Sequence, residues 1–153
     1  ATRIRLLGLR ARDEFRGLPL QLMSAHADLA CTAADVVLVT SGTATLEVAL
    51  CKRPMVISYK ISPLTYAYVR RKIKVPHVGL PNILLEKGAV PELLQGRATP
   101  KRLAAAVAEW YESPQDSADL KQDFHNLHLL LKKDTAALAA QAVLAEAGVV
   151  KAV

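Results

Sequence analysis

The chain has 153 residues, of which 52% are hydrophobic and 22% charged. That length suits one domain of ~100–150 residues, and the composition is too apolar for a disordered chain. No apolar run reaches the ~18 residues that a membrane-spanning helix needs, so we expect any membrane contact to be peripheral.

Basic residues outnumber acidic ones, with 20 Lys and Arg against 14 Asp and Glu and a net charge of +6. A positive field of this kind attracts phosphate groups, nucleic acid or an anionic membrane surface. Because aromatic residues make up only 5% of the chain and no RNA-recognition or zinc-finger pattern occurs, we expect no nucleic-acid partner. Cys31 and Cys51 are too few for a disulfide framework and match no zinc-ligand spacing, which favours a cytoplasmic protein.

Segments typical of strands and helices alternate over the first part of the chain. The apolar run before Ser24 is typical of a strand, and Ser24 is a candidate N-cap for the helix that follows. The run Val36–Val39 is short, apolar and rich in β-branched residues, as in a strand buried on both faces of a parallel sheet. The expected strands are 18–23, 36–39 and 55–59, and the expected helices are 24–33, 44–51 and one that begins near Pro63.

From Thr99 onward the pattern is helical only, with a boundary expected at Ser113-Pro114. Strand–helix alternation followed by helices predicts an α/β fold, since such alternation implies right-handed crossovers and a parallel sheet. We expect a Rossmann-like parallel-sheet domain over residues 1–112 and an α-helical C-terminal tail over residues 113–153. The chain begins without Met, which suggests that it is a piece of a longer polypeptide.

The segment 39–47 follows an expected strand and opens an expected helix. At the carboxyl edge of a parallel sheet, such a loop directs free backbone N–H groups and the positive end of the helix dipole into one space, which favours an anion such as a diphosphate. Gly42 permits close approach of the backbone, and the hydroxyls of Ser41, Thr43 and Thr45 can donate hydrogen bonds to phosphate oxygens. The alternative is that Ser41 or Thr43 only caps the helix.

Glu47 lies four residues after Thr43 and therefore on the same helix face, one turn further in. From there its carboxylate could accept hydrogen bonds from the two ribose hydroxyls of a nucleotide whose phosphates occupy the loop. It is not a capping-box glutamate, because the residue three positions earlier is Ala44. The alternative is a solvated acid that the helix dipole stabilises.

Two further segments carry groups suited to a ligand. Asn82, after Pro81, could bind a sugar hydroxyl or a phosphate oxygen through its amide, or serve only as a turn residue. The segment 63–74 joins aromatic and aliphatic residues to cations, as an interfacial helix does, with an ordinary surface helix as the alternative. The cations that we expect to face an anionic membrane are Arg70, Arg71, Lys72 and Lys74.

We expect neither a metal nor another cofactor. His125 and His128 stand three residues apart, but no third ligand accompanies them. The chain also has no Asp-x-Asp pair to hold a divalent ion beside a diphosphate. Phosphate would then be neutralised by backbone N–H groups, a helix dipole and cations.

Taken in order, these segments resemble the C-terminal half of the lipid-A-disaccharide synthase family, from about Leu20 to Ala147. The resemblance implies a glycosyltransferase of the GT-B type, in which this chain is the donor-binding half and lacks both the first strand of its domain and the whole N-terminal domain. The residues that carry the resemblance are Ala34–Val39, Ser41–Glu47, Pro54–Val56, Tyr59-Lys60, Leu80–Asn82 and Pro91–Gln95.

The implied reaction transfers 2,3-diacylglucosamine, with inversion, from its UDP-activated form to 2,3-diacylglucosamine 1-phosphate in lipid A synthesis. The catalytic base is expected on the absent domain, so the fragment alone should be inactive. Thr45 lies within the family's Ser-Gly-Thr-x-x-x-Glu pattern. That pattern and the family's Pro-Asn pair place UDP-facing residues at Ser41, Gly42, Thr43, Glu47, Pro81 and Asn82, with support from Tyr59, Glu92 and Gln95.

The partners implied by the resemblance are the UDP-sugar donor, the lipid monosaccharide 1-phosphate acceptor and an anionic membrane, with a peripheral location on the cytoplasmic side of the inner membrane. The terminal helices would cross back to the absent domain, and a homodimer is another way to cover their apolar faces. Two alternatives stay open. One is a different UDP-sugar enzyme of the GT-B type, such as an N-acetylglucosaminyltransferase or a UDP-sugar epimerase, and the other is a basic module that binds anions without catalysis.

Overall fold

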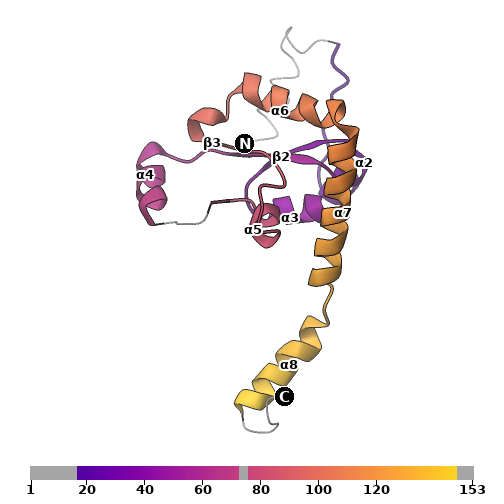
Figure 1. Ribbon diagram of the computed structural model, residues 1–153, viewed down its shortest axis with the longest axis vertical. Coiled ribbons are helices and arrows are strands. Elements are labelled where there is room, and N and C mark those ends of the chain that lie inside the picture. Colours follow the sequence, from indigo (N-terminus) through magenta and orange to yellow (C-terminus); the bar gives the residue numbers. More distant parts are fainter. Residues whose placement is uncertain (1–16, 73–75, 148–153) are drawn as a thin grey trace.

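A parallel sheet forms the centre of the computed structural model, which describes residues 17–72 and 76–147 (Figure 1). Its described strands are β1 (Val37–Thr40), β2 (Met55–Tyr59) and β3 (Glu92–Leu94), paired in the order β1-β2-β3. In this register Val37 lies opposite Met55, and Ile57 lies opposite Glu92. The expected α/β class with a parallel sheet is confirmed.

Helices cover both faces of this sheet. In Figure 1, α6 lies on one side of the strands, α3 and α5 lie on the other, and α7 runs past both layers. By contrast, α4 and α8 stand away from this body. The helices are α2 (Ala27–Ala33), α3 (Thr43–Leu50), α4 (Pro63–Lys72), α5 (Leu80–Leu84), α6 (Pro100–Glu112), α7 (Pro114–Leu131) and α8 (Thr135–Glu146), with a 3-10 helix, η2, at Gln95–Arg97.

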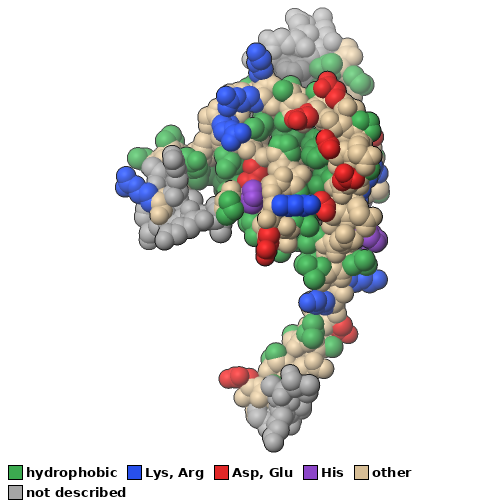
Figure 2. Space-filling model, in the orientation of Figure 1, with side chains coloured by type: hydrophobic (Ala, Val, Ile, Leu, Met, Phe, Trp, Pro, Cys, Tyr) green, Lys and Arg blue, Asp and Glu red, His purple; other side chains and the backbone are tan. Residues whose placement is uncertain are grey.

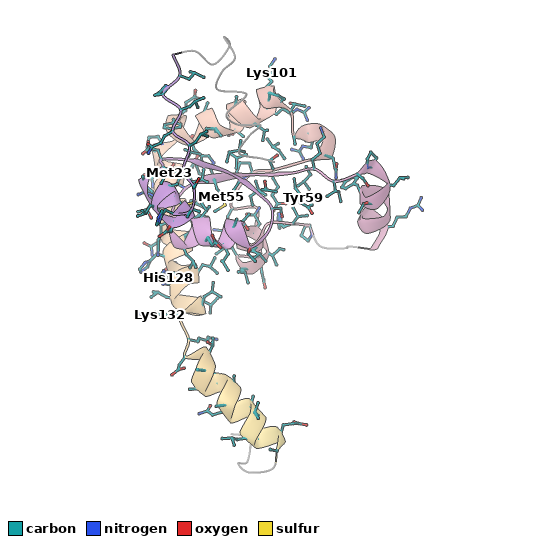
Figure 3. The ribbon with its side chains drawn as sticks, turned by 180° about the vertical axis from the view of Figure 1, so that it is seen from behind. Met23, Met55, Tyr59, Lys101, His128 and Lys132 are labelled. Carbon is teal, nitrogen blue, oxygen red and sulfur yellow. The ribbon has the colours of Figure 1, made fainter. Side chains whose placement is uncertain are left out.

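The hydrophobic core lies where α3 and α7 meet β2. Met55 and Ile57 are fully buried, and Figure 3 shows Met55 in the interior of the sheet layer. They pack with Leu120 and Phe124 of α7, which lie four residues apart and so share one helix face. Ser113, the expected boundary, lies at the break between α6 and α7. Since α7 belongs to the same core as the sheet, this break alone does not divide the chain into domains.

The strand expected at 18–23 does not form, and Ser24 is not the N-cap of the helix behind it. That helix begins at Ala27, with His26 as N-cap, and both Ala25 and His26 have positive φ angles. A strand is held by hydrogen bonds to a neighbouring strand, and no described strand pairs with this apolar run. Its large apolar side chains are 38–54% exposed, namely Leu18, Leu20, Leu22 and Met23. Both expectations are therefore wrong for this structure.

The other elements match the expected order, with small shifts and three additions. β2 has the expected bounds, while β1 and α3 differ from the expected 36–39 and 44–51 by one residue at each end. The additions are α5, β3 and η2, which are too short to give a periodic apolar pattern.

Helix α8 exposes its apolar side chains to solvent. Leu138 is 50% exposed and Val143 is 67% exposed. The expectation that the last helices cross to another domain, or to a second copy, stays a prediction. Within the described ranges, no helix combines the length and the apolar character needed to cross a membrane.

Replacing Phe124 with Ala should lower the free energy of unfolding by ~3–5 kcal/mol, because it opens a cavity between α3, α7 and β2. Chemical denaturation measures the change. The matched control is Leu129→Ala on the same helix, where the side chain is 58% exposed and the expected change is within ~0.5 kcal/mol. Similar losses in the two variants would mean that α7 does not pack as described.

Candidate functional site

The loop between β1 and α3 opens onto free space at Gly42. Gly42 is the N-cap of α3 and has φ 143°, a conformation that favours glycine. A Cβ atom built there would meet no other atom within 4 Å. Neighbouring side chains therefore do not fill the corner that a ligand would enter.

Free backbone donors gather at this corner. Within the described residues, the N–H groups of Gly42, Thr43 and Ala44 form no hydrogen bond, whereas Thr45 N donates to the Gly42 carbonyl at 3.1 Å. Free N–H groups at a helix N-terminus, together with the helix dipole, favour an anion. No side chain caps α3, so the alternative that Ser41 or Thr43 serves as the cap is excluded.

The loop hydroxyls are not equally available. Ser41 Oγ donates to the Val78 carbonyl at 3.0 Å, and the buried Thr45 Oγ1 donates to the Gly42 carbonyl at 2.7 Å. Both protons satisfy main-chain carbonyls, so the expectation that these two hydroxyls donate to phosphate does not fit this conformation. Thr43 is exposed, and its hydroxyl has no partner among the described residues.

Glu47 lies one helical turn after Thr43, a rise of ~6 Å along α3. It is exposed, and no ion pair joins it to another described residue. Burial raises the pKa of the Cys31 thiol on α2, and the charges of Cys51 and then Glu47 raise it further. Glu47 is exposed, so its carboxylate is accessible to an incoming donor. Its contact with ribose stays a prediction.

Pro81 and Asn82 are buried in α5 rather than exposed to a ligand. Asn82 Nδ2 donates to the Val90 carbonyl at 2.9 Å and to Glu92 Oε1 at 2.8 Å, while Asn82 Oδ1 accepts from Val90 N at 2.9 Å. These bonds use both amide protons and the amide oxygen. Asn82 therefore ties α5 to the start of β3, and neither a direct contact with UDP nor a turn role fits its geometry.

Glu92 braces the segment that leads into α5. Its side chain is 10% exposed and accepts hydrogen bonds from Val78 N and Gly79 N, both at 3.0 Å. His77 Nδ1 lies 3.8 Å from the same carboxylate. Sequence reasoning missed the part played by Val78 and Gly79. The only signal was the glycine, whose added Cβ would overlap Cδ1 of Ile57.

Tyr59 and Gln95 lie at the carboxyl ends of β2 and β3. Figure 3 shows Tyr59 at the end of its strand, where the chain continues toward α4. With its amide oriented to satisfy both polar atoms, Gln95 donates to the Ile61 carbonyl at 3.0 Å and accepts from Ile61 N at 3.2 Å. Gln95 thus fixes the connection between β2 and α4.

Helix α4 stands beyond the carboxyl end of β2 (Figure 1). Leu64 is 85% exposed and Arg71 is also exposed. The side chains of Arg70 and Lys72, and the whole of Lys74, lie outside the described residues. A contact of these cations with a membrane stays a prediction.

We call residues 41–47, which are the turn after β1 and the start of α3, the 41–47 loop. Two described cavities lie away from it. The larger, of about 470 Å³, lies between α6, α7 and residues 87–91, and Figure 2 shows acidic side chains along its α7 side. The smaller, of about 220 Å³, lies beside His77 and Ile83. Neither cavity includes a residue of the 41–47 loop, where Gly42, Thr43 and Ala44 are exposed. The described ranges contain no cluster of three or more side chains suited to a metal ion.

Comparison with known proteins identifies the family. The family model described as lipid-A-disaccharide synthetase matches residues 7–145. The lipid-A-disaccharide synthase of Neisseria meningitidis serogroup B is 72% identical over 97% of this chain and 38% of its own length. Those of Chromobacterium violaceum and Cellvibrio japonicus are 59% and 47% identical, over 87% and 86% of this chain and 34% of each relative. The chain belongs to this family and spans about 38% of the length of the Neisseria relatives.

Replacing Asn82 with Asp should lower the free energy of unfolding by ~3 kcal/mol, because an oxygen would then face Val90 O and Glu92 Oε1 where Nδ2 now donates. Thermal or chemical denaturation measures the loss. Asn126→Asp is the control, since Asn126 is exposed and its oxygen only accepts from Gln122. If both variants were equally stable, Asn82 would not tie α5 to β3.

Proposed function

We propose that this chain supplies the donor-nucleotide site of a lipid-A-disaccharide synthase and acts as a glycosyltransferase together with the remainder of that protein. The observation that carries the proposal is the corner at Gly42, where the N–H groups of Gly42, Thr43 and Ala44 bond to no described residue and Glu47 follows one turn later. The diphosphate of a UDP-sugar would bind the N–H groups, and Glu47 would accept hydrogen bonds from the ribose. The family and the names of the relatives support this assignment.

In the proposed reaction, UDP-2,3-diacylglucosamine is the donor and 2,3-diacylglucosamine 1-phosphate is the acceptor. The acceptor hydroxyl oxygen attacks the anomeric carbon, the bond from that carbon to UDP breaks, and a base outside this chain takes the hydroxyl proton. Negative charge then grows on the β-phosphate. Preorganised donors stabilise such charge, and losing one of them typically raises the barrier by ~2.7–4 kcal/mol. The free N–H groups at Gly42, Thr43 and Ala44 would act at this step.

The rest of the site would come from the part of the protein that this chain does not span. The relatives are more than twice as long as the matched segment, which covers 38% of the Neisseria proteins. The 41–47 loop forms one open wall, so the acceptor site and the base would belong to the other wall. On this proposal the 153-residue chain binds UDP but does not transfer sugar by itself.

UDP should stabilise the chain against thermal unfolding, by ~2.7 kcal/mol at 100 times its dissociation constant. Glu47→Gln should weaken UDP but leave pyrophosphate binding unchanged, because the carboxylate is assigned to ribose and the backbone N–H groups to phosphate. Calorimetric titration with the two ligands measures the difference. Glu112→Gln, at an exposed position on α6, is the control.

Three results are informative here. Equal weakening of UDP and pyrophosphate by Glu47→Gln would remove the ribose assignment. Binding of pyrophosphate with the same affinity as UDP would favour a basic anion-binding module. A folded wild-type chain that UDP does not stabilise would contradict the proposed function.

We also propose that α4 rests on an anionic membrane, which would place the protein peripherally on the cytoplasmic side of the inner membrane. Leu64 is exposed at the start of α4, and the cations lie at its other end. Such a helix combines apolar and cationic contact with lipid. Because the strands are parallel, β1 and β2 end at the same edge of the sheet. The 41–47 loop follows β1 and α4 follows β2, so both lie beyond this carboxyl edge (Figure 1). A donor with acyl chains could then bind the loop while its chains remain in the lipid.

Replacing Arg70, Arg71, Lys72 and Lys74 with Gln should reduce binding to vesicles of phosphatidylglycerol and phosphatidylcholine, because each cation near an anionic surface contributes ~1 kcal/mol. The control replaces Arg97, Lys101, Arg102 and Lys121, all exposed, and lowers the net charge equally. Co-sedimentation at low ionic strength measures binding. An equal loss in both variants would mean that net charge, and not α4, attracts the vesicles.

A further inference from the structure

One peptide unit beside the 41–47 loop is held from both sides. The Gly79 N–H donates to Glu92 Oε1 at 3.0 Å, and the Val78 carbonyl accepts from Ser41 Oγ at 3.0 Å. These N–H and C=O groups belong to the same peptide bond, which is planar, so they point in opposite directions from one rigid unit. Glu92 therefore sets the direction of the carbonyl that Ser41 meets.

Glu92 is itself firmly held. Its carboxylate also accepts from Val78 N at 3.0 Å and from Asn82 Nδ2 at 2.8 Å, and Asn82 is fully buried. Charge-assisted hydrogen bonds of this kind are roughly twice as strong as neutral ones. On the other side, Gly79 lies so close to Ile57 that the segment has no room to move toward the sheet. Turning the peptide unit would break several of these contacts together.

This arrangement limits what Ser41 can offer a ligand. A serine hydroxyl has one proton and two lone pairs. The proton is directed to the Val78 carbonyl, so only the lone pairs remain for another partner. Ser41 is half-buried beside the exposed Gly42, at the border of the loop. Toward a nucleotide it is an acceptor, which suits a hydroxyl or N–H group and does not suit a phosphate oxygen.

We propose that Glu92, through the peptide unit between Val78 and Gly79, holds the Ser41 hydroxyl as a hydrogen-bond acceptor that selects a hydroxyl or N–H group of the bound nucleotide. Ser41 is then a specificity-determining residue and Glu92 is a positioning residue. This inference rests on the proposed function, because it takes the ligand at the 41–47 loop to be a nucleoside diphosphate. Phosphate recognition is left to the backbone N–H groups of Gly42, Thr43 and Ala44.

The test compares the dissociation constants of UDP and pyrophosphate by calorimetric titration of the chain. Ser41→Ala should weaken UDP about fivefold, the change that one neutral hydrogen bond carries, and leave pyrophosphate unchanged. Glu92→Gln should weaken UDP to a similar extent, and the double variant should lose no more than either single variant. Ser41→Thr, which keeps the hydroxyl, should restore UDP binding.

The ratio of the two dissociation constants separates positioning from a loss of folding, because unfolded protein lowers the apparent affinity for both ligands equally. Glu86→Gln is the matched control, since Glu86 is exposed and makes no side-chain hydrogen bond with a described residue. Should Glu92→Gln not fold, the Ser41 variants still decide the acceptor role.

Weakening of pyrophosphate by Ser41→Ala, to the same degree as UDP, would overturn the inference by showing that Ser41 donates to phosphate. Additive losses in the double variant would show that Glu92 does not act through Ser41. These results differ from the failure of the proposed function, in which the wild-type chain binds no UDP at all.

Discussion

The carboxylate of Glu92 joins two parts of the chain that are separate in sequence, the start of β3 and the segment 78–82. It lies at the start of β3, accepts hydrogen bonds from the segment before α5, and meets the amide of Asn82 within α5. A carboxylate that is 10% exposed is costly to bury unless its oxygens are hydrogen-bonded, and here they are. The position of α5, and through Val78 the orientation of Ser41, depend on this one group.

The 41–47 loop differs from the neighbouring segment at Val78 and Gly79, whose N–H groups bond to Glu92. In the loop, the N–H groups of Gly42, Thr43 and Ala44 bond to no described residue. Gly42 allows the chain to turn where no side chain is present, and no side chain caps the N-terminus of α3. Protein interiors rarely leave N–H groups without partners, so free groups at a surface are those that water or a ligand can satisfy. A rigid support beside unsatisfied donors is the arrangement that electrostatic stabilisation of a leaving diphosphate requires. The structure thus separates the residues that hold the site from those proposed to touch the ligand.

Sequence patterns predicted the elements that a local signal marks, such as a proline at a helix start or a short run of apolar residues in a buried strand. The bounds of β2 followed from a short, mostly apolar run after Pro54. The break at Ser113 followed from a proline that starts a new helix. The run 18–23 is also largely apolar, but a strand depends on a neighbouring strand, which composition does not reveal. Asn82 shows that site residues are equally hard to predict from sequence, because a polar residue beside proline can face a ligand or can bond to a buried carbonyl. Only the contacts with Val90 and Glu92 distinguish the two.

The carboxyl edge of the sheet brings the two proposed activities of the chain together. β1 ends in the loop with free N–H groups, and β2 ends at Tyr59, from which the chain reaches α4. Gln95, just after β3, fixes the connection through Ile61. Parallel strands all end at the same edge, so a nucleotide at β1 and a lipid surface at α4 would face one side of the molecule. For a substrate with a nucleotide head and acyl chains, the nucleotide site and the lipid-facing helix must lie on one side of the protein, since both ends are bound at the same membrane surface.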